Sequence, residues 1–143
     1  MIEKARATGL YAQLDVADMV QGLGARPDAS ADLILAADTV IYLHDLAPLL
    51  REAARVLAPD GLVAFTAETH GGDGVILGEG LRYAHGAPYV KAVVAAVDLM
   101  LSGLDELSAR NEDGRPVPGL VVVAAKRSEP GIQTKTPTAR PGF

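Results

Sequence analysis

The stretch from Asp32 to Glu68 constrains the fold of this chain most, because its apolar pattern changes from strand to helix and back to strand. Leu33 to Ala37 is a continuous apolar run between two aspartates, which is typical of a parallel strand buried on both faces. Leu62 to Ala67 is a second apolar run, and it follows a Pro-Asp-Gly turn. Two such strands joined by a helix predict an α/β sheet.

The segment between these strands predicts a helix that packs on the sheet. Asp45 can cap its first turn, and Pro48 is tolerated there because the first turn needs no hydrogen bond from its nitrogen. The turn of Pro59, Asp60 and Gly61 ends the helix. Apolar residues recur at helical spacing and form one stripe, at Leu46, Leu49, Leu50, Ala53 and Leu57.

The rest of the chain alternates between helical and extended patterns. Helices are expected at residues 2–8, 19–23 and 88–97, and strands at residues 13–16, 99–109 and 120–126. Gly103 interrupts the strand at 99–109 and predicts a β-bulge, and the short connection to the last strand predicts an antiparallel hairpin. Residues 70–86 are expected to be a glycine-rich loop followed by irregular chain. Residues 128–143 predict a disordered tail, so the folded domain is expected to span residues 1–127.

Composition narrows the classes of function. The chain has 13 basic and 18 acidic residues and a net charge of −5, which argues against a non-specific nucleic-acid surface. It has no cysteine, which excludes disulfides, cysteine–zinc sites and thiol catalysis and fits a cytoplasmic protein. The longest aliphatic stretch, Leu120 to Ala125, is too short to span a bilayer, so no membrane partner is expected.

The order of these elements resembles the carboxyl-terminal two-thirds of class I S-adenosylmethionine (SAM)-dependent methyltransferases. The turn at residues 57–61 is similar to the Leu-x-Pro-Gly-Gly turn of that family, with Asp60 in place of the first glycine. Further segments resemble a bacterial subgroup often joined to tetratricopeptide repeats, namely Arg82-Tyr83-Ala84-His85, Tyr89-Val90 and residues 114–119. The resemblance implies a Rossmann-like sheet, mainly parallel with a carboxyl-terminal antiparallel hairpin. It also implies SAM as cofactor and a small-molecule or protein methyl acceptor that the sequence does not name.

The sequence departs from the family pattern at its start. The family begins with a strand, a glycine-rich turn, and a second strand whose acidic residue binds the ribose, and no counterpart precedes residue 13. The resemblance therefore implies a truncated sheet, in which the family strand order 3-2-1-4-5-7-6 lacks strands 1 and 2. The strand at residues 33–37 would then have an unpaired apolar edge. We expect that the strand at 13–16 collapses onto this edge, that a second copy or a partner chain covers it, or that the chain is poorly stable alone.

Three hypotheses for function follow. The first is an active SAM-dependent methyltransferase. The second is a truncated or split methyltransferase-like protein that is inactive alone and acts through a partner chain. The third is a different nucleotide-binding α/β protein, which accounts less well for the terminal hairpin and for residues 82–85.

Four residues are candidates for cofactor binding. By the resemblance, Asp18 lies where an acidic side chain accepts a hydrogen bond from the adenine amino group, with Ala17 and Met19 beside the adenine. Read from the residues alone, Asp18 also suits a helix cap and Met19 a core position. Asp38 ends the strand at 33–37, at the edge where ligands bind in such sheets, and is a candidate to orient the cofactor amine or a substrate.

The remaining candidates lie on the acceptor side. Tyr42, Tyr83 and His85 are candidates for substrate contact, the last two because they lie in the long segment where the family places such contacts. Asp38 and His44 are the catalytic candidates. His44 is either a general base, a role that imidazole can have at neutral pH, or simply a polar residue near the start of the helix. No metal site is expected, because no metal-binding motif joins the oxygen and nitrogen ligands Glu68, His70, Asp73 and His85.

Overall fold

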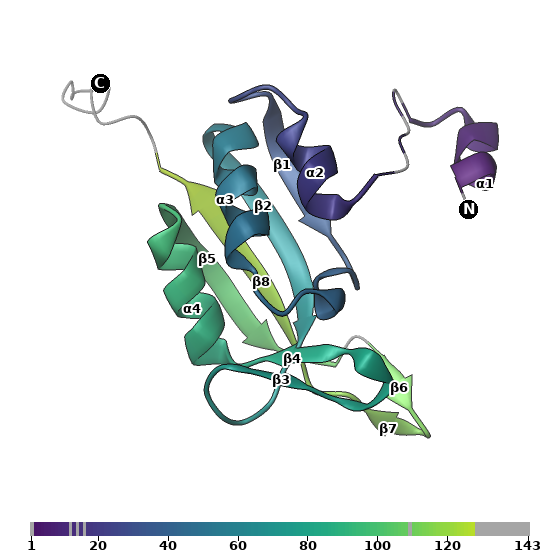
Figure 1. Ribbon diagram of the computed structural model, residues 1–143, viewed down its shortest axis with the longest axis vertical. Helices are drawn as coiled ribbons and strands as arrows, with labels where there is room; N and C mark the ends of the chain where they lie inside the picture. Colours follow the sequence, from purple (N-terminus) through teal and green to yellow (C-terminus); the bar gives the residue numbers. More distant parts are fainter. Residues whose placement is uncertain (1, 12, 14, 16, 109, 128–143) are drawn as a thin grey trace.

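The structure, a computed structural model, describes residues 2–11, 13, 15, 17–108 and 110–127, and a six-stranded mixed sheet lies at its centre (Figure 1). Four strands follow one another across this sheet, in the order β1 (Ala31–Ala36), β2 (Leu57–Glu68), β8 (Gly119–Lys126) and β5 (Leu99–Glu106). β1 and β2 are parallel, and β8 runs antiparallel to both β2 and β5. The predicted α/β class and the antiparallel hairpin at the carboxyl end are therefore confirmed. The order also matches strands 4-5-7-6 of the sheet implied by the resemblance.

Three helices form a layer over one face of the sheet, namely α2 (Met19–Gly24), α3 (Ala47–Val56) and α4 (Ala87–Ala96) (Figure 1). The apolar stripe predicted for α3 is buried, and each of its five side chains is at most 7% exposed. Pro48 and Pro88 lie in the first turns of α3 and α4, where no hydrogen bond is lost. Asp45 accepts a hydrogen bond from the Ala47 nitrogen at 3.0 Å, but it lies one residue before the helix cap, which is Leu46.

The two faces of the sheet differ in burial. On β2, Val63 and Phe65 face the helices and are each 3% exposed, whereas Leu62 faces away and is 39% exposed. On β1, Leu33 and Leu35 are 53% and 69% exposed. The expectation that this strand is buried on both faces is therefore wrong. The reason is that, among the described residues, helices cover one face only and β1 lies at the edge of the sheet.

Turns and short elements refine the predicted boundaries. β2 begins at Leu57, directly after α3, and the predicted turn falls inside it, where Asp60 has a φ of +66° and the register with β1 shifts. Gly61 is required there, because an added Cβ would lie 2.8 Å from the Ala58 carbonyl oxygen. The predicted bulge at Gly103 is confirmed by a register shift between β5 and β8.

Two regions predicted to be turns or irregular chain contain short strands. Residues 70–86 contain β3 (Val75–Leu77) and β4 (Tyr83–His85), which pair with each other, and β4 also pairs with β2 at Glu68. Strands of three residues are too short for periodicity to reveal. Between β5 and β8, Asp113 and Gly114 have φ values of +51° and +77° and join β6 (Asn111–Glu112) to β7 (Arg115–Pro116) in a small hairpin.

The amino-terminal part agrees only partly with the sequence prediction. α1 (Ile2–Thr8) has the predicted bounds, has no buried residue and lies away from the sheet (Figure 1). Of the strand predicted at 13–16, Leu14 and Val16 lie outside the described residues, and Gln13 and Asp15 are not in a strand. The predicted tail at 128–143 also lies outside the described residues. Within the described ranges, no helix is both long and apolar enough to cross a membrane.

Candidate functional site

A cavity of about 320 Å³ opens between α2, α3 and β1. Its walls are largely apolar, with Ile34 and Ala36 from β1, Phe65 from β2 and Leu49 and Leu50 from α3. Its polar lining residues are Asp15, Asp18 and Arg26. A mostly apolar hollow with a few polar groups at its rim is the usual form of a small-molecule site.

The three residues predicted to surround an adenine ring, Ala17, Asp18 and Met19, all line this cavity. Asp18 also caps α2, because its Oδ2 accepts hydrogen bonds from the nitrogens of Val20 and Gln21, both at 3.1 Å. Both capping bonds use Oδ2 and neither uses Oδ1. The capping and ligand-facing roles of Asp18 are thus compatible in one side chain.

An ion pair holds the segment before α2 against the chain that follows it. Arg26 contacts Asp15 at 3.0 Å and donates a further hydrogen bond to the side chain of Gln13 at 3.1 Å. Arg55 on α3 donates to the carbonyl oxygens of Leu23 and Gly24 at the end of α2, each at 3.2 Å. These contacts join the end of α2 to α3 and the segment before α2 to the chain after it.

Asp38 lies beyond the carboxyl end of β1, outside the lining of this cavity. Its φ is +53°, a left-handed conformation that a residue other than glycine seldom adopts. The Asp38 nitrogen donates to the Thr66 hydroxyl at 2.8 Å, and its carboxylate pairs with Arg82 at 2.8 Å while remaining 71% exposed. The end of β1 is therefore fixed to β2 and carries an exposed carboxylate.

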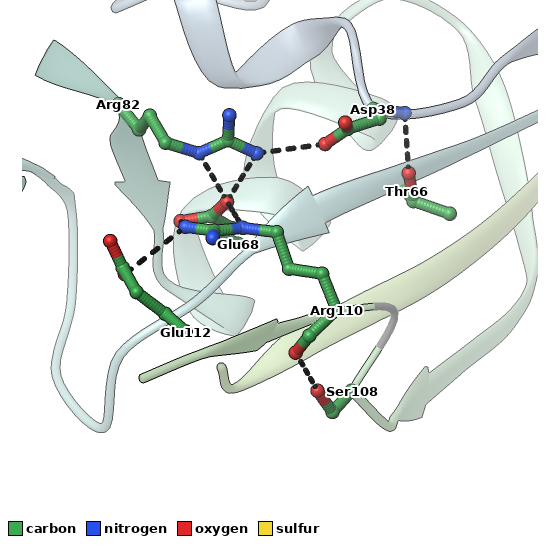
Figure 2. A network of polar contacts seen from close by, with 7 residues as sticks. All are labelled: Asp38, Thr66, Glu68, Arg82, Ser108, Arg110 and Glu112. Carbon is green, nitrogen blue, oxygen red and sulfur yellow. Dashed lines mark hydrogen bonds and ion pairs between the residues drawn. The ribbon is translucent and has the colours of Figure 1, made fainter. Parts of the chain in front are cut away.

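The carboxyl end of β2 carries a network of charged side chains (Figure 2). Arg82 and Arg110 both bind Oε2 of Glu68, at 2.6 and 2.8 Å, and Arg110 also contacts Glu112 at 3.4 Å. Burial by itself would raise the pKa of Glu68, but the hydrogen bonds and charges of Arg110 and Arg82 outweigh it, so this pKa lies below its usual value. The network joins β2 to segments 14 and 42 residues further along the chain.

The sequence alone does not reveal this network. It offers Glu68 only as an oxygen ligand without a supporting metal motif, and Arg110 carries no local signal. Glu68 and Arg110 are 42 positions apart, and no helical or strand periodicity relates residues at that separation. Their contact therefore becomes known only from the folded structure.

The acceptor-side candidates fall into exposed and buried groups. Tyr42 is 62% exposed and lies beneath the Arg82 guanidinium, at 5.9 Å, while the rings of His44 and Tyr83 meet edge to face at 5.4 Å. His85, by contrast, is fully buried, and its ring lies 5.8 Å from that of Tyr89.

His85 contacts only protein groups. Its Nε2 lies 2.8 Å from the Leu43 carbonyl oxygen and so carries the proton, while its Nδ1 is buried without a hydrogen-bond partner. Burial lowers the pKa of His85, and the ring is neutral at pH 7. The structure thus places His85 in the core, whereas Tyr42 and His44 are exposed and Tyr83 is partly buried.

The residues weighed as metal ligands do not converge. His70 bonds within its own loop, since Nδ1 accepts from the Gly72 nitrogen at 3.1 Å and Nε2 lies 2.9 Å from the Gly74 carbonyl oxygen. Across the part of the chain that the structure describes, no group of three or more His, Asp or Glu side chains could hold a metal ion.

Comparison with known proteins gives a match to one family over part of the chain. Residues 1–65 match a family described as a methyltransferase domain. No curated protein matches the chain in sequence.

Solved structures give a wider match. A SAM-dependent methyltransferase from Methanosarcina mazei is 14% identical, with a TM-score of 0.67 over 90% of this chain and 78% of that one. The 1,6-didemethyltoxoflavin N1-methyltransferase from Burkholderia thailandensis, solved with bound 1,6-didemethyltoxoflavin and S-adenosylhomocysteine, is 16% identical, with a TM-score of 0.68 over 88% and 57%. The (4+2)-cyclase SpnF is 18% identical, with a TM-score of 0.68 over 89% and 61%.

At such identities the likeness establishes the fold, and the cyclase illustrates that one fold supports more than one chemistry. This chain spans less than two thirds of the length of two of the three structures. Residues 1–65 match a methyltransferase domain in sequence, and the described chain has the fold of SAM-dependent methyltransferases.

Proposed function

We propose that this chain is a SAM-dependent methyltransferase domain whose described part holds the adenosine half of the cofactor in the cavity between α2, α3 and β1. One observation carries the proposal. Every residue that lines the cavity lies between Asp15 and Phe65, inside the segment that matches the methyltransferase family. The match in sequence and the cavity in the fold thus concern the same residues.

The lining of the cavity fits an adenosine. Its volume of about 320 Å³ is at the lower end of the range of small-molecule sites, roughly 300–1,000 Å³. Ile34, Ala36 and Met19 offer apolar surface to the faces of a base, and Asp18 Oδ1 offers an acceptor to its amino group. We assign only the adenosine end of the cofactor to these residues.

The acceptor would bind beyond the ends of β1 and β2. Bound SAM supplies a sulfonium methyl group, whose transfer depends mainly on alignment with the attacking atom. The exposed Asp38 carboxylate is placed to orient the cofactor amine or the acceptor, and the Tyr42 and Tyr83 rings offer surface for the acceptor. His44 is the candidate general base, because its exposed imidazole lies beside the ring of Tyr83. His85 supports this surface from within the core.

A second candidate function is a methyltransferase-like protein that acts only with a partner chain. The observation that favours it is the uncovered sheet, because Leu33 and Leu35 of β1 are exposed and β1 pairs with β2 alone among the described residues. The finer resemblance to the subgroup joined to tetratricopeptide repeats remains a prediction.

Binding of S-adenosylhomocysteine, measured by isothermal titration calorimetry, tests the proposal. Asp18→Asn should weaken binding roughly ten-fold, because one charged hydrogen bond is lost while asparagine still caps α2. Asp98→Asn is the matched control, since Asp98 is 85% exposed, lies between α4 and β5 and does not line the cavity. Equal binding by all three proteins would contradict the assignment of the adenosine site. No heat with millimolar ligand would favour the partner-dependent alternative.

A further inference from the structure

The segment 43–46 links the short helix η1 (Val40–Tyr42) to α3 and carries His44, the candidate base. None of its four residues belongs to a helix or a strand. Two of its backbone groups, the carbonyl oxygen of Leu43 and the nitrogen of Leu46, are bound by side chains 42 and 43 positions further along the chain. His44 lies between these two fixed points, so the place of its ring depends on the residues that hold them.

Tyr89, in the first turn of α4, binds the end of this segment. Its hydroxyl accepts a hydrogen bond from the Leu46 nitrogen at 3.0 Å and donates one to Asp45 Oδ1 at 3.4 Å. Leu46 is the cap residue of α3, and the amide at that position has no carbonyl partner within its own helix. A leucine side chain offers no acceptor either, so the start of α3 takes its acceptor from α4.

His85, the last residue of β4, binds the start of the segment. Its Nε2 lies 2.8 Å from the Leu43 carbonyl oxygen, although the imidazole is fully buried. Its Nδ1 finds no hydrogen-bond partner among the described residues, and an unpaired buried polar atom costs stability. A phenylalanine would fill this position without that cost, but it could not bind Leu43.

The two anchoring side chains belong to one corner of the fold. The rings of His85 and Tyr89 stack, with their centroids 5.8 Å apart and their planes at 25°. The corner is itself held on both sides, because the Thr69 hydroxyl donates to the His85 carbonyl oxygen at 2.7 Å and the Val90 nitrogen donates to the Gly86 carbonyl oxygen at 3.1 Å. Both ends of the segment 43–46 are thus fixed to the same support.

We propose that His85 and Tyr89 are positioning residues, which together hold the segment 43–46 and so set the orientation of His44 against Tyr83. The rings of His44 and Tyr83 meet edge to face at 5.4 Å. The inference deepens the proposed function and rests on it for the role of His44 in methyl transfer. A base must lie within hydrogen-bond reach of the proton that it removes, and a misplacement of about 1 Å can cost about a hundred-fold in rate.

Solution NMR of Tyr89→Phe can decide this, because the variant keeps the stacked ring and removes only the hydroxyl. The chain has three histidines, so their imidazole signals can be assigned one by one. We expect the Leu46 amide to exchange about ten-fold faster with solvent. The His44 signals should move because the ring changes its place relative to Tyr83, whereas those of His70, which bonds within its own loop, should not.

Two variants of His85 give an independent readout. His85→Phe removes the donor to Leu43 and should also move the His44 signals. His85→Gln keeps an N–H donor at a similar reach and should leave these signals closer to those of the parent chain. Tyr11→Phe is the matched control, since Tyr11 is 60% exposed and lies before α2. Thermal unfolding checks that each variant is folded.

Unchanged His44 signals in either Tyr89→Phe or His85→Phe would overturn the proposal. So would equal shifts in the two His85 variants, or a shift of the His44 signals in Tyr11→Phe. Titration with S-adenosylhomocysteine separates this inference from the proposed function. Tyr89→Phe should bind it as the parent chain does, because neither anchoring ring lines the cavity. A parent chain that does not bind it would refute the cofactor site, and the NMR spectra would still decide the role of His85 and Tyr89.

Discussion

Replacing Glu68 by Gln should destabilise the fold through loss of charge alone. Gln keeps the shape of the side chain and one carbonyl oxygen, but it cannot pair ionically with Arg82 and Arg110. Both guanidinium groups bind one carboxylate oxygen, at 2.6 and 2.8 Å, and the Glu68 side chain is only 15% exposed. The two arginine side chains are 17% and 28% exposed, so water replaces the lost partner only in part.

The expected loss in the free energy of unfolding lies between two limits. Exposed ion pairs contribute about 0–1 kcal/mol, and breaking a fully buried pair costs about 3–5 kcal/mol. Because Glu68 is mostly buried and Gln retains an acceptor, we expect a loss of about 2 kcal/mol in the free energy of unfolding. For a domain of this size that loss corresponds to a fall of about 8 °C in Tm.

The pH dependence of this stability loss tests whether the charge of Glu68 causes it. The pKa of Glu68 is lower in the folded chain than its usual value near 4.5, so the unfolded chain binds the proton first as the pH falls. The stabilisation by ionised Glu68 is therefore complete above that usual value and is lost as the pH falls through the folded pKa. The difference between the parent chain and Glu68→Gln should be full at pH 7 and should shrink below about pH 4.

Urea unfolding followed by circular dichroism at a series of pH values measures this difference. Glu112→Gln is the control, since Glu112 is 54% exposed and meets Arg110 at 3.4 Å, and its loss should cost about 0.5 kcal/mol or less. Equal losses in the two variants would refute the reasoning. A Glu68→Gln difference that stays constant from neutral to acidic pH would refute it as well.

Two further predictions concern the chain around β4. Gly86→Ala should lower the free energy of unfolding by about 2 kcal/mol, because the new Cβ would lie 2.4 Å from the Gly72 carbonyl oxygen. Gly71→Ala, with nothing within 4 Å, should be nearly neutral, and similar urea midpoints for the two variants would rule out the steric cause. His85→Phe should make the free energy of unfolding depend less on pH below neutrality. Burial lowers the pKa of His85 below 6.5, so the unfolded chain binds a proton first and the parent loses stability as the pH falls through that value. Urea titrations between neutral pH and about pH 5.5 measure this slope, and equal slopes for the parent chain and His85→Phe would contradict the prediction.

Elements with a long apolar pattern could be predicted from the sequence. The stripe on α3 has the burial that its periodicity predicts, and β8 forms where the apolar run at residues 120–126 predicts a strand. The bulge at Gly103 was also predictable, because a glycine in the interior of a strand pattern commonly marks a bulge. Such features are local, and local spacing determines them.

Features that depend on the assembled sheet could not be predicted. The exposure of Leu33 and Leu35 depends on which layers cover β1, and an apolar run alone does not tell one covered face from two. Of the candidate site, Ala17, Asp18 and Met19 share one cavity as the resemblance implied, but burial of His85 needed the packing of β4 against Leu43.

α3 continues into β2 without a loop, and this connection determines which wall of the cavity is held most firmly. α3 ends at Val56 and the strand begins at the fully buried Leu57, so the wall formed by α3 is mechanically continuous with the sheet. α2 has no such attachment, since a loop at residues 25–30 joins it to β1 and hydrogen bonds from Arg55 hold its end. The cavity therefore has one rigid wall and one hinged wall. We therefore expect a ligand larger than the present volume to displace α2 and not α3, and to break the hydrogen bonds from Arg55 to Leu23 and Gly24.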